Sequence, residues 1–241
     1  MLDVDVKAQE AIARSTVYKA LSLGFSPPTK EVLAFIRKGY RQLEEALRFL
    51  PVGYELGEAV ALLGKAVKEP DGWEGEHNRL FRVGLVATPY ETEHDPMRAL
   101  RKGQVLADIL GFYTAFGLKP SERLKELPDH IAVELEFMSL LLLKEAYARL
   151  EGWEEQVNLC VDAEGKFLRD HLGWWAFQFS DQVEKSAQVP LYPALSQLLG
   201  RFLRFELQHL GVEPLKADEG IQAKACDDEA FTCPFANGID R

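Results

Sequence analysis

The stretch ELPDHIAVELEFMSLLLLKEAYARLEGW, residues 126–153, predicts a long helix inside a protein core. Its apolar residues recur at steps of four, three and four, the spacing of one buried helical face: Ile131, Leu135, Met138 and Leu142. We expect the helix to span about residues 129–150. A helix of this kind can pack on several neighbours at once, which favours a helical bundle as the fold.

The start of this helix carries an acid, an imidazole and two further acids: Asp129, His130, Glu134 and Glu136. A step of four places His130 and Glu134 on one face, apart from the apolar stripe. One interpretation is structural: Asp129 caps the helix, His130 lies at or near the surface, and the glutamates are solvated. The other is functional: an acidic lip beside a groove, which would suit a ligand that carries a guanidinium group.

Helical periodicity continues along almost the whole chain, so the expected fold class is all-α. The periodic segments are bounded by proline, glycine or polar residues: 7–24, 30–49, 55–68, 97–116, 154–161, 167–186 and 193–210. Residues 73–97 are the least regular, and no run of alternating β-branched residues predicts a strand. We expect a single-domain bundle of about ten helices over residues 1–211 and an irregular, mobile tail over residues 212–241.

The composition is that of a folded, acidic protein. Hydrophobic residues make up 47% of the 241 residues, which is enough for a sizeable core. A formal net charge of −10 disfavours binding to nucleic acid. The first residues lack the pattern of a secretory signal, and the longest apolar run, FMSLLLL, is too short to cross a membrane. We therefore expect a cytoplasmic protein without stable membrane insertion.

Several residues have the spacing of metal ligands. Three Glu-x-x-His pairs match the spacing of carboxylate-bridged di-metal sites in helical bundles: Glu74 and His77, Glu91 and His94, Glu206 and His209. Glycine or proline interrupts the first two pairs, so only the third lies on a convincing helix. Cys226 and Cys233 are further apart than zinc ligands usually are, which favours free thiols and leaves a redox pair or metal clip open. We expect no metal and no cofactor, with a helical di-metal carboxylate enzyme as the alternative.

Four segments together resemble a known family. They are EHNRLF (76–81), PYETE (89–93), LPDHIAVELEFM (127–138) and FLRDHL (167–172), the last followed by Trp175 and YPAL (192–195). In these motifs the chain resembles the TorD-like, or DmsD-like, redox-enzyme maturation chaperones over roughly residues 10–210. Thr92 stands where the family more often has serine, and the tail beyond Gly211 is not covered.

The resemblance implies an all-α cytoplasmic chaperone rather than an enzyme. Such proteins bind the twin-arginine signal peptide of a molybdopterin oxidoreductase precursor, of the DMSO reductase family. They hold the precursor until its molybdenum cofactor is inserted and then release it for export. The implied partner is thus the signal peptide or the catalytic subunit of such an enzyme, and the implied state is a monomer or a homodimer. A related branch binds the mature subunit alone, and this alternative stays open.

The resemblance also indicates where the peptide binds, because in the family the helix start at Asp129 and His130 contributes to the proposed groove. A twin-arginine segment is cationic and precedes an apolar run, so its receptor should offer carboxylates beside apolar surface. Tyr90 could add a cation–π contact, and His130 could make the site sensitive to pH. We expect the carboxylates at Glu91, Glu93, Asp129 and Glu134, and the apolar surface at Leu80, Phe81, Pro89, Tyr90 and Phe137.

Overall fold

The structure of the chain is a computed structural model, and it describes residues 2–51, 54–68, 71–84, 86–118 and 126–215. Most of these residues are helical, and the only β pairing among them is an isolated bridge, so the all-α prediction is confirmed. The tail predicted to be mobile lies almost entirely outside the described residues, as do Cys226 and Cys233.

The described residues form the following α-helices. They are α1 (Leu2–Phe25), α2 (Lys30–Ala46), α3 (Tyr54–Ala66), α4 (Trp73–His77), α5 (Pro96–Leu100), α6 (Lys102–Ala115), α7 (Ile131–Glu151), α8 (Glu154–Phe167), α9 (Gly173–Ser186) and α10 (Leu191–Leu210). Short 3₁₀ turns span Leu47–Phe49 and Glu91–Glu93, and single π-helical turns span Asn78–Val83 and Leu168–Leu172.

Two of the predicted helices are interrupted. Residues 97–116 form α5 and α6, because the backbone of Arg101 leaves the helical region between them. Residues 167–186 contain a π-helical turn before α9, and α8 extends to Phe167 rather than ending near residue 161. The segment expected to be irregular, residues 73–97, holds α4 and the first π-helical turn.

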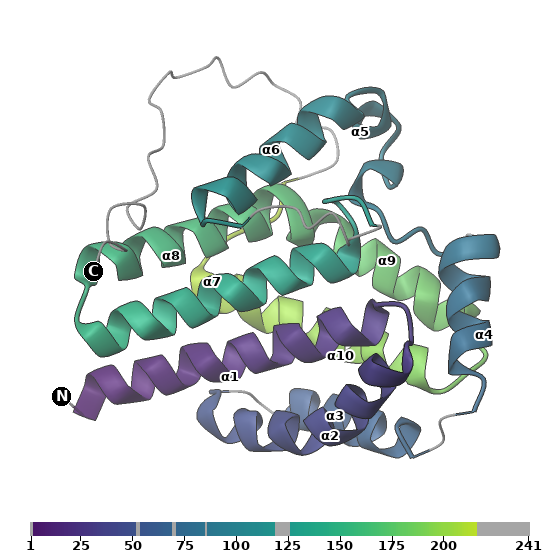
Figure 1. Cartoon of the computed structure of the whole chain (residues 1–241), viewed down its shortest axis with the longest axis horizontal. Helices are drawn as coiled ribbons and strands as arrows, with labels where there is room; N and C mark the ends of the chain where they lie inside the picture. Colours follow the sequence, from purple (N-terminus) through teal and green to yellow (C-terminus); the bar gives the residue numbers. More distant parts are fainter. Residues whose placement is uncertain (1, 52–53, 69–70, 85, 119–125, 216–241) are drawn as a thin grey trace.

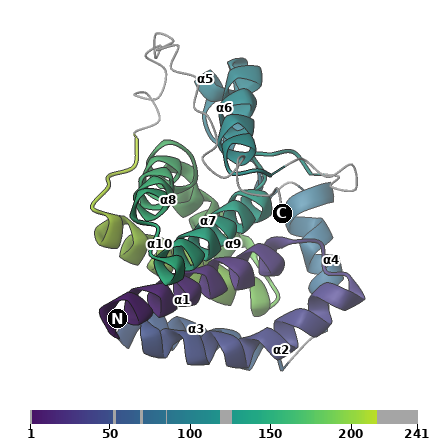
Figure 2. The same cartoon turned by 60° about the vertical axis from the view of Figure 1, so that its left-hand side comes forward.

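The long helix that the sequence singles out lies at the centre of the bundle. Figures 1 and 2 show α7 between α1 and α8, with α6 over one side of the bundle and α2 and α3 over the other. Serine hydroxyls join α1 to the backbone of α7: Ser15 Oγ donates to the Ser139 carbonyl at 2.8 Å, and Ser22 Oγ donates to the Ala132 carbonyl at 2.8 Å. The predicted apolar stripe is fully buried, as expected: Ile131, Leu135, Met138 and Leu142.

A buried ionic network joins α1 to three other helices. Arg14 on α1 is 2% exposed, and its Nε lies 2.7 Å from Glu206 Oε1 on α10. Its Nη2 lies 3.0 Å from Glu164 Oε2 on α8, and its Nη1 lies 3.6 Å from Glu145 Oε2 on α7. Arg149 also binds Glu145, so two guanidinium groups serve three carboxyls. Burial raises the pKa of Glu164 well above its usual range despite Arg14, which favours a neutral carboxyl there.

Candidate functional site

The segments that carry the family motifs meet at a short backbone bridge. Tyr90 and His130 form an isolated antiparallel β-bridge, although forty positions of sequence separate them. The Glu91 N–H donates to the Asp129 carbonyl at 2.9 Å, and the Ile131 N–H donates to the Pro89 carbonyl at 2.8 Å. The PYETE and LPDHI stretches are thereby fixed side by side at the start of α7.

A pocket of about 320 Å³ opens beside this bridge. It combines aromatic and imidazole side chains with one carboxylate and one guanidinium group: His77, Phe81, Arg82, Pro89, Tyr90, Glu126 and His130. The Tyr90 ring meets the His130 ring edge-on at 5.1 Å between centroids, and the His77 ring meets Phe81 in the same way at 5.1 Å. Residues from three segments of the chain, 77–82, 89–90 and 126–130, thus form one concave surface.

Glu126 is the carboxylate of the pocket. Its Oε2 accepts a 2.7 Å hydrogen bond from the Tyr90 hydroxyl, and its Oε1 accepts a 3.2 Å hydrogen bond from Arg82 Nη2. Burial raises the pKa of Glu126, but the Tyr90 hydrogen bond, the Arg82 guanidinium and His130 together lower it below its usual value. The pocket therefore presents an ionised carboxylate at neutral pH.

The two histidines of the pocket are buried. His130 is the N-cap of α7, because its Nδ1 accepts a 3.1 Å hydrogen bond from the Ala132 N–H. Burial lowers the pKa of His130 to about 4 and the pKa of His77 to about 4. The expectation that Asp129 caps the helix, with His130 at or near the surface, is therefore wrong, since the imidazole does the capping from the interior. Both rings are neutral at pH 7.

Asp129 instead anchors the segment that carries the PYETE motif. Its Oδ2 accepts hydrogen bonds from the Thr92 hydroxyl at 2.7 Å and from the Thr92 N–H at 3.2 Å, and the side chain is fully buried. Burial raises the pKa of Asp129, although the Thr92 hydrogen bonds act in the opposite direction. Threonine keeps the hydroxyl that a serine would supply, so the departure from the family motif preserves this contact.

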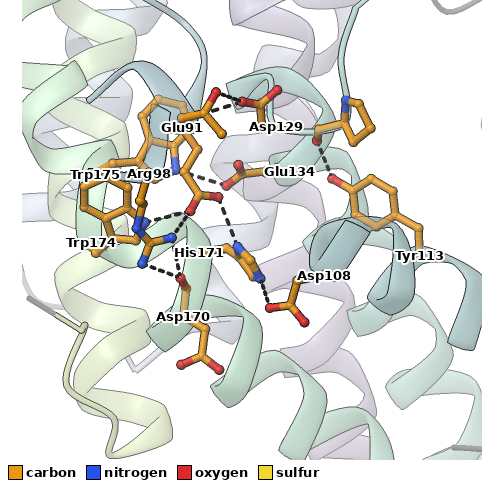
Figure 3. Close-up of polar contacts among 12 residues, drawn as sticks. Glu91, Arg98, Asp108, Tyr113, Asp129, Glu134, Asp170, His171, Trp174 and Trp175 are labelled. Atoms are coloured by element: carbon orange, nitrogen blue, oxygen red, sulfur yellow. Dashed lines mark hydrogen bonds and ion pairs between the residues drawn. The ribbon is translucent and has the colours of Figure 1, made fainter. Parts of the chain in front are cut away.

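Glu91, which follows the bridge residue Tyr90 in the sequence, lies at the centre of a polar cluster (Figure 3). Its Oε1 accepts hydrogen bonds from Arg98 Nη1 and, at 2.9 Å, from Trp174 Nε1, while its Oε2 lies 3.0 Å from His171 Nδ1. The Arg98 guanidinium also lies over the Trp174 ring, 4.2 Å from its centroid. The other nitrogen of His171 lies 3.2 Å from Asp108 Oδ2. Side chains of the protein itself thus contact both oxygens of the Glu91 carboxylate.

A π-helical turn positions two groups of this cluster. In residues 168–172 the extra residue of the π turn places His171 beside Glu91 and turns the Asp170 carbonyl toward Arg98, whose Nη atoms donate to it at 3.3 Å. The turn closes with the Gly173 N–H on the Leu168 carbonyl. π turns of this kind often occur at functional sites, where they redirect side chains.

Glu134 lies deeper, one turn into α7. It is fully buried, and its Oε2 accepts a 3.2 Å hydrogen bond from Trp175 Nε1. Burial, followed by the negative charges of Glu91 and Asp129, raises its pKa well above the usual range. The expectation that Glu134 is solvated is therefore wrong, and a protonated, neutral carboxyl is favoured. Glu136 does reach the surface, where its Oε1 pairs with Lys19 Nζ at 2.5 Å.

The residues predicted to bind the peptide thus fall into separate groups. Phe81, Pro89, Tyr90 and His130 line the pocket. Glu91, Asp129 and Glu134 are buried in the polar interior, and Leu80 and Phe137 belong to the apolar core. Glu93 is exposed, accepts a hydrogen bond from Thr88, and lies 4.0 Å from Lys102 Nζ.

Sequence reasoning missed the charged groups that complete the site. Glu126 directly precedes the LPDH stretch and Arg82 directly follows the EHNRLF stretch, so each is next to a motif that was recognised. Arg98, His171 and Trp174 complete the cluster around Glu91, and of these only His171 lies within a recognised motif, FLRDHL. Their position next to these motifs is the sequence feature that could have identified Glu126 and Arg82 as candidate site residues.

The Glu-x-x-His pairs have other partners. Glu206 binds Arg14, while His209 Nδ1 lies 3.6 Å from Glu10 Oε1. Glu91 binds Arg98, and His94 Nε2 lies 2.9 Å from the Thr88 carbonyl. Glu74 is exposed, whereas His77 lines the pocket. Within the described ranges no group of three or more histidine, cysteine, aspartate or glutamate side chains could hold a metal ion, so these pairs lend the di-metal alternative no support.

A second pocket of about 270 Å³ lies between α1, α2 and α7. Its wall is mostly apolar, with the Lys19–Glu136 ion pair beside it, and no residue predicted to bind the peptide lines it. Across the described helices none has both the length and the apolar character that crossing a bilayer requires.

Comparison with known proteins finds relatives that are named for reductases. The family model described as "Nitrate reductase delta subunit" matches residues 36–181. The perchlorate reductase assembly chaperone protein of Dechloromonas aromatica (strain RCB) is 28% identical over 211 residues, which cover 85% of this chain and 92% of that protein. The chlorate reductase assembly chaperone protein of Ideonella dechloratans is 31% identical over 149 residues, 61% of this chain and 74% of that protein.

A more distant similarity extends to proteins named for TorD. The chaperone protein TorD of Vibrio atlanticus (strain LGP32) is 25% identical over 127 residues, 53% of this chain and 58% of that protein. The family match covers more than half of the chain and includes the EHNRLF, PYETE, LPDHI and FLRDHL segments. The chain therefore belongs to the nitrate reductase delta subunit family, which contains the TorD-like chaperones that its motifs resemble.

Proposed function

We propose that this protein is a cytoplasmic assembly chaperone for the precursor of a molybdopterin oxidoreductase. It binds the twin-arginine signal peptide of that precursor and holds the enzyme until its cofactor is inserted. The perchlorate, chlorate and selenate reductase assembly chaperone proteins among its relatives support a reductase as the client.

The observation that carries this proposal is the pocket beside the Tyr90–His130 bridge. Three of the four family motifs contribute to it, and residues far apart in the sequence line a single concave surface. The remaining motif, FLRDHL, supports the same place from behind, because His171 contacts Glu91 next to the bridge. A packing role alone would not require these segments to surround an open cavity.

The chemistry of the pocket matches the peptide. A guanidinium group needs an ionised carboxylate and gains from an aromatic face, and Glu126 and Tyr90 supply these. An apolar run needs adjacent apolar surface, which Phe81 and Pro89 offer within the pocket and the exposed Val83 and Val86 offer beside it in sequence. The net charge of −10 favours the approach of a cationic peptide over long range.

Calorimetric titration with twin-arginine signal peptides of molybdoenzyme precursors from the same genome tests the proposal. We expect one peptide to bind with a dissociation constant of about 1 μM or tighter, equivalent to about −8 kcal/mol. The Tyr90→Ala variant should bind about tenfold more weakly, because it loses the ring and the hydrogen bond to Glu126.

Tyr147→Ala is the matched control, because Tyr147 is an exposed tyrosine on α7 that does not line the pocket. It should bind like the wild type. Binding that survives replacement of both arginines by alanine, or equal losses in the two tyrosine variants, would contradict the proposed site. Absence of binding to every signal peptide, with capture of the mature catalytic subunit, would identify the subunit itself as the client surface.

A further inference from the structure

The carboxylate of the pocket already holds a guanidinium group that belongs to the chain. Arg82 Nη2 lies 3.2 Å from Glu126 Oε1, and the Arg82 side chain is 49% exposed. Arg82 lies in the π-helical turn of residues 78–83 and immediately follows Phe81 in the pocket wall. The contact is therefore a surface ion pair at the mouth of a pocket, not a structural bridge inside the core.

Glu126 is held in place independently of Arg82. Its other oxygen accepts the 2.7 Å hydrogen bond from the Tyr90 hydroxyl, and Tyr90 is fixed in turn by the β-bridge to His130. The carboxylate keeps this orientation when Arg82 moves away. One oxygen, Oε1, is then free to accept a hydrogen bond from another donor.

The charges that face Glu126 leave room for one cation. Burial lowers the pKa values of His77 and His130 to about 4, so neither imidazole carries charge at pH 7. The ionised groups that line the pocket are then Glu126 and Arg82. A second cation added beside Arg82 would meet like charge, whereas a cation that replaces Arg82 restores the same balance.

The ring of Tyr90 shows the same preference for a cation. Lys102 Nζ lies over this ring, 5.9 Å from its centroid, at the outer limit of a cation–π contact. Two features of the pocket attract positive charge, the Glu126 carboxylate and the Tyr90 ring. Each already has a cationic side chain of the protein near it, Arg82 and Lys102 respectively.

We propose that Arg82 is a built-in occupant of a guanidinium subsite formed by Glu126 and Tyr90, and that an arginine of the client binds by displacing it. This inference rests on the proposed function, because it names the residue that receives a client arginine. The client arginine and Arg82 compete for the same oxygen of Glu126. The apparent affinity of the protein for the client is therefore lower, by the fraction of time that Arg82 occupies this carboxylate.

A double-mutant cycle tests the displacement, with peptide affinity measured by calorimetry for wild type, Arg82→Ala, Glu126→Gln and the double variant. An exposed ion pair of this kind is weak, so Arg82→Ala should tighten binding by about two- to fivefold. Glu126→Gln should weaken binding about tenfold or more. In the Glu126→Gln background, removal of Arg82 should change the affinity by less than about 1.5-fold, because Arg82 and the client arginine no longer compete for a carboxylate.

Arg48→Ala controls for charge alone, since Arg48 is an exposed arginine in the 3₁₀ turn after α2 and does not line the pocket. It should leave the affinity within about 1.5-fold of wild type. An equal gain in Arg82→Ala and Arg48→Ala would show a general charge effect and overturn the inference. Weaker binding in Arg82→Ala would also overturn it, because Arg82 would then be a contact and not a competitor.

A small probe separates this inference from the proposed function. Nα-acetyl-arginine methylamide, followed by chemical-shift changes at the Tyr90 ring, should bind Arg82→Ala more tightly than wild type. If the probe binds Arg82→Ala more tightly but no signal peptide binds, the proposed client is refuted and the guanidinium subsite is supported. Signal-peptide binding without a gain in Arg82→Ala for either ligand would refute the displacement and leave the client standing. No response of Arg82→Ala to the probe at millimolar concentration would refute the subsite.

Discussion

His171 lies between two carboxylates, with Nδ1 3.0 Å from Glu91 Oε2 and Nε2 3.2 Å from Asp108 Oδ2. Burial alone would lower its pKa, but the hydrogen bonds and charges of Asp108 and Glu91 raise it to about 9, from an ordinary value of 6.5. The folded state therefore binds this proton more tightly than the unfolded state does. The resulting stabilisation is complete below pH 6.5 and is lost as the pH rises through 9.

Urea unfolding at pH 6.5 and pH 9 measures this contribution. We expect wild type to lose about 2 kcal/mol more than the His171→Gln variant over this interval, after allowance for screening because Asp108 is more than half exposed. His77 and His130, with pKa values of about 4, do not interfere, because wild type and variant both contain them and their contributions cancel in the comparison. Equal pH dependence in wild type and variant would show that His171 is neutral in the folded protein.

At this scale the sequence identified residue types correctly but not their surroundings. His130 was expected at or near the surface on one interpretation and in a groove on the other; it lines the pocket, but it is buried and caps α7. Spacing along a helix cannot reveal the partner of a charged group when that partner comes from a distant segment. Glu91 illustrates the limit, because His171 and Trp174, eighty and more positions away, engage its carboxylate.

The two π-helical turns are closed by glycines that the local backbone requires. A Cβ at Gly173 would collide with the Leu168 carbonyl oxygen, and a Cβ at Gly84 would collide with the Arg79 carbonyl oxygen. In each case the obstacle is backbone five residues earlier, the distance that a π turn closes. A side chain at either position would therefore force the turn to open, and the turn at residues 168–172 positions His171 for Glu91.

Gly173→Ala should lower the free energy of unfolding by about 2 kcal/mol, because backbone cannot move aside as a flexible side chain can. Gly111→Ala is the matched control, since Gly111 lies within α6 with nothing near its Cβ position. That change should leave stability unchanged or raise it by up to about 1 kcal/mol, as helix propensity predicts. Chemical unfolding of both variants measures these changes. An unchanged free energy of unfolding in Gly173→Ala would mean that the turn tolerates a side chain.

Periodicity predicted most helices because each long element buries one face. It placed α3, α7 and α10 correctly in outline, and the buried stripe of Ile131 and Leu135 follows the spacing read from the sequence. It could not reveal α5 as a separate helix, or the π turns. These features depend on contacts between buried side chains from distant segments, which periodicity does not record. Arg98 on α5 and His171 in the second π turn both face Glu91.

At the scale of the whole molecule, α1 is held by packing against α7 and by one ionic network. The Arg14 guanidinium contacts Glu145, Glu164 and Glu206, so a single side chain joins α1 to α7, α8 and α10. The first half of the chain supplies the pocket residues His77 to Tyr90, and the N-cap residue of α7, His130, is the partner of Tyr90 in the bridge. The position of the pocket therefore depends on how firmly these helices are assembled.

Arg14→Met should lower the free energy of unfolding by about 3–5 kcal/mol, because it removes the guanidinium group that binds the buried side chains of Glu164 and Glu206. Urea unfolding followed by circular dichroism measures the loss. Lys185→Met removes the partner of Asp181 in an exposed pair on α9 and should change stability by less than about 1 kcal/mol. Adding Glu206→Gln to Arg14→Met should recover part of the loss, since a neutral amide needs no counter-charge. A loss below about 1 kcal/mol in Arg14→Met, or no recovery in the double variant, would mean that the ionic network does not hold α1 in place.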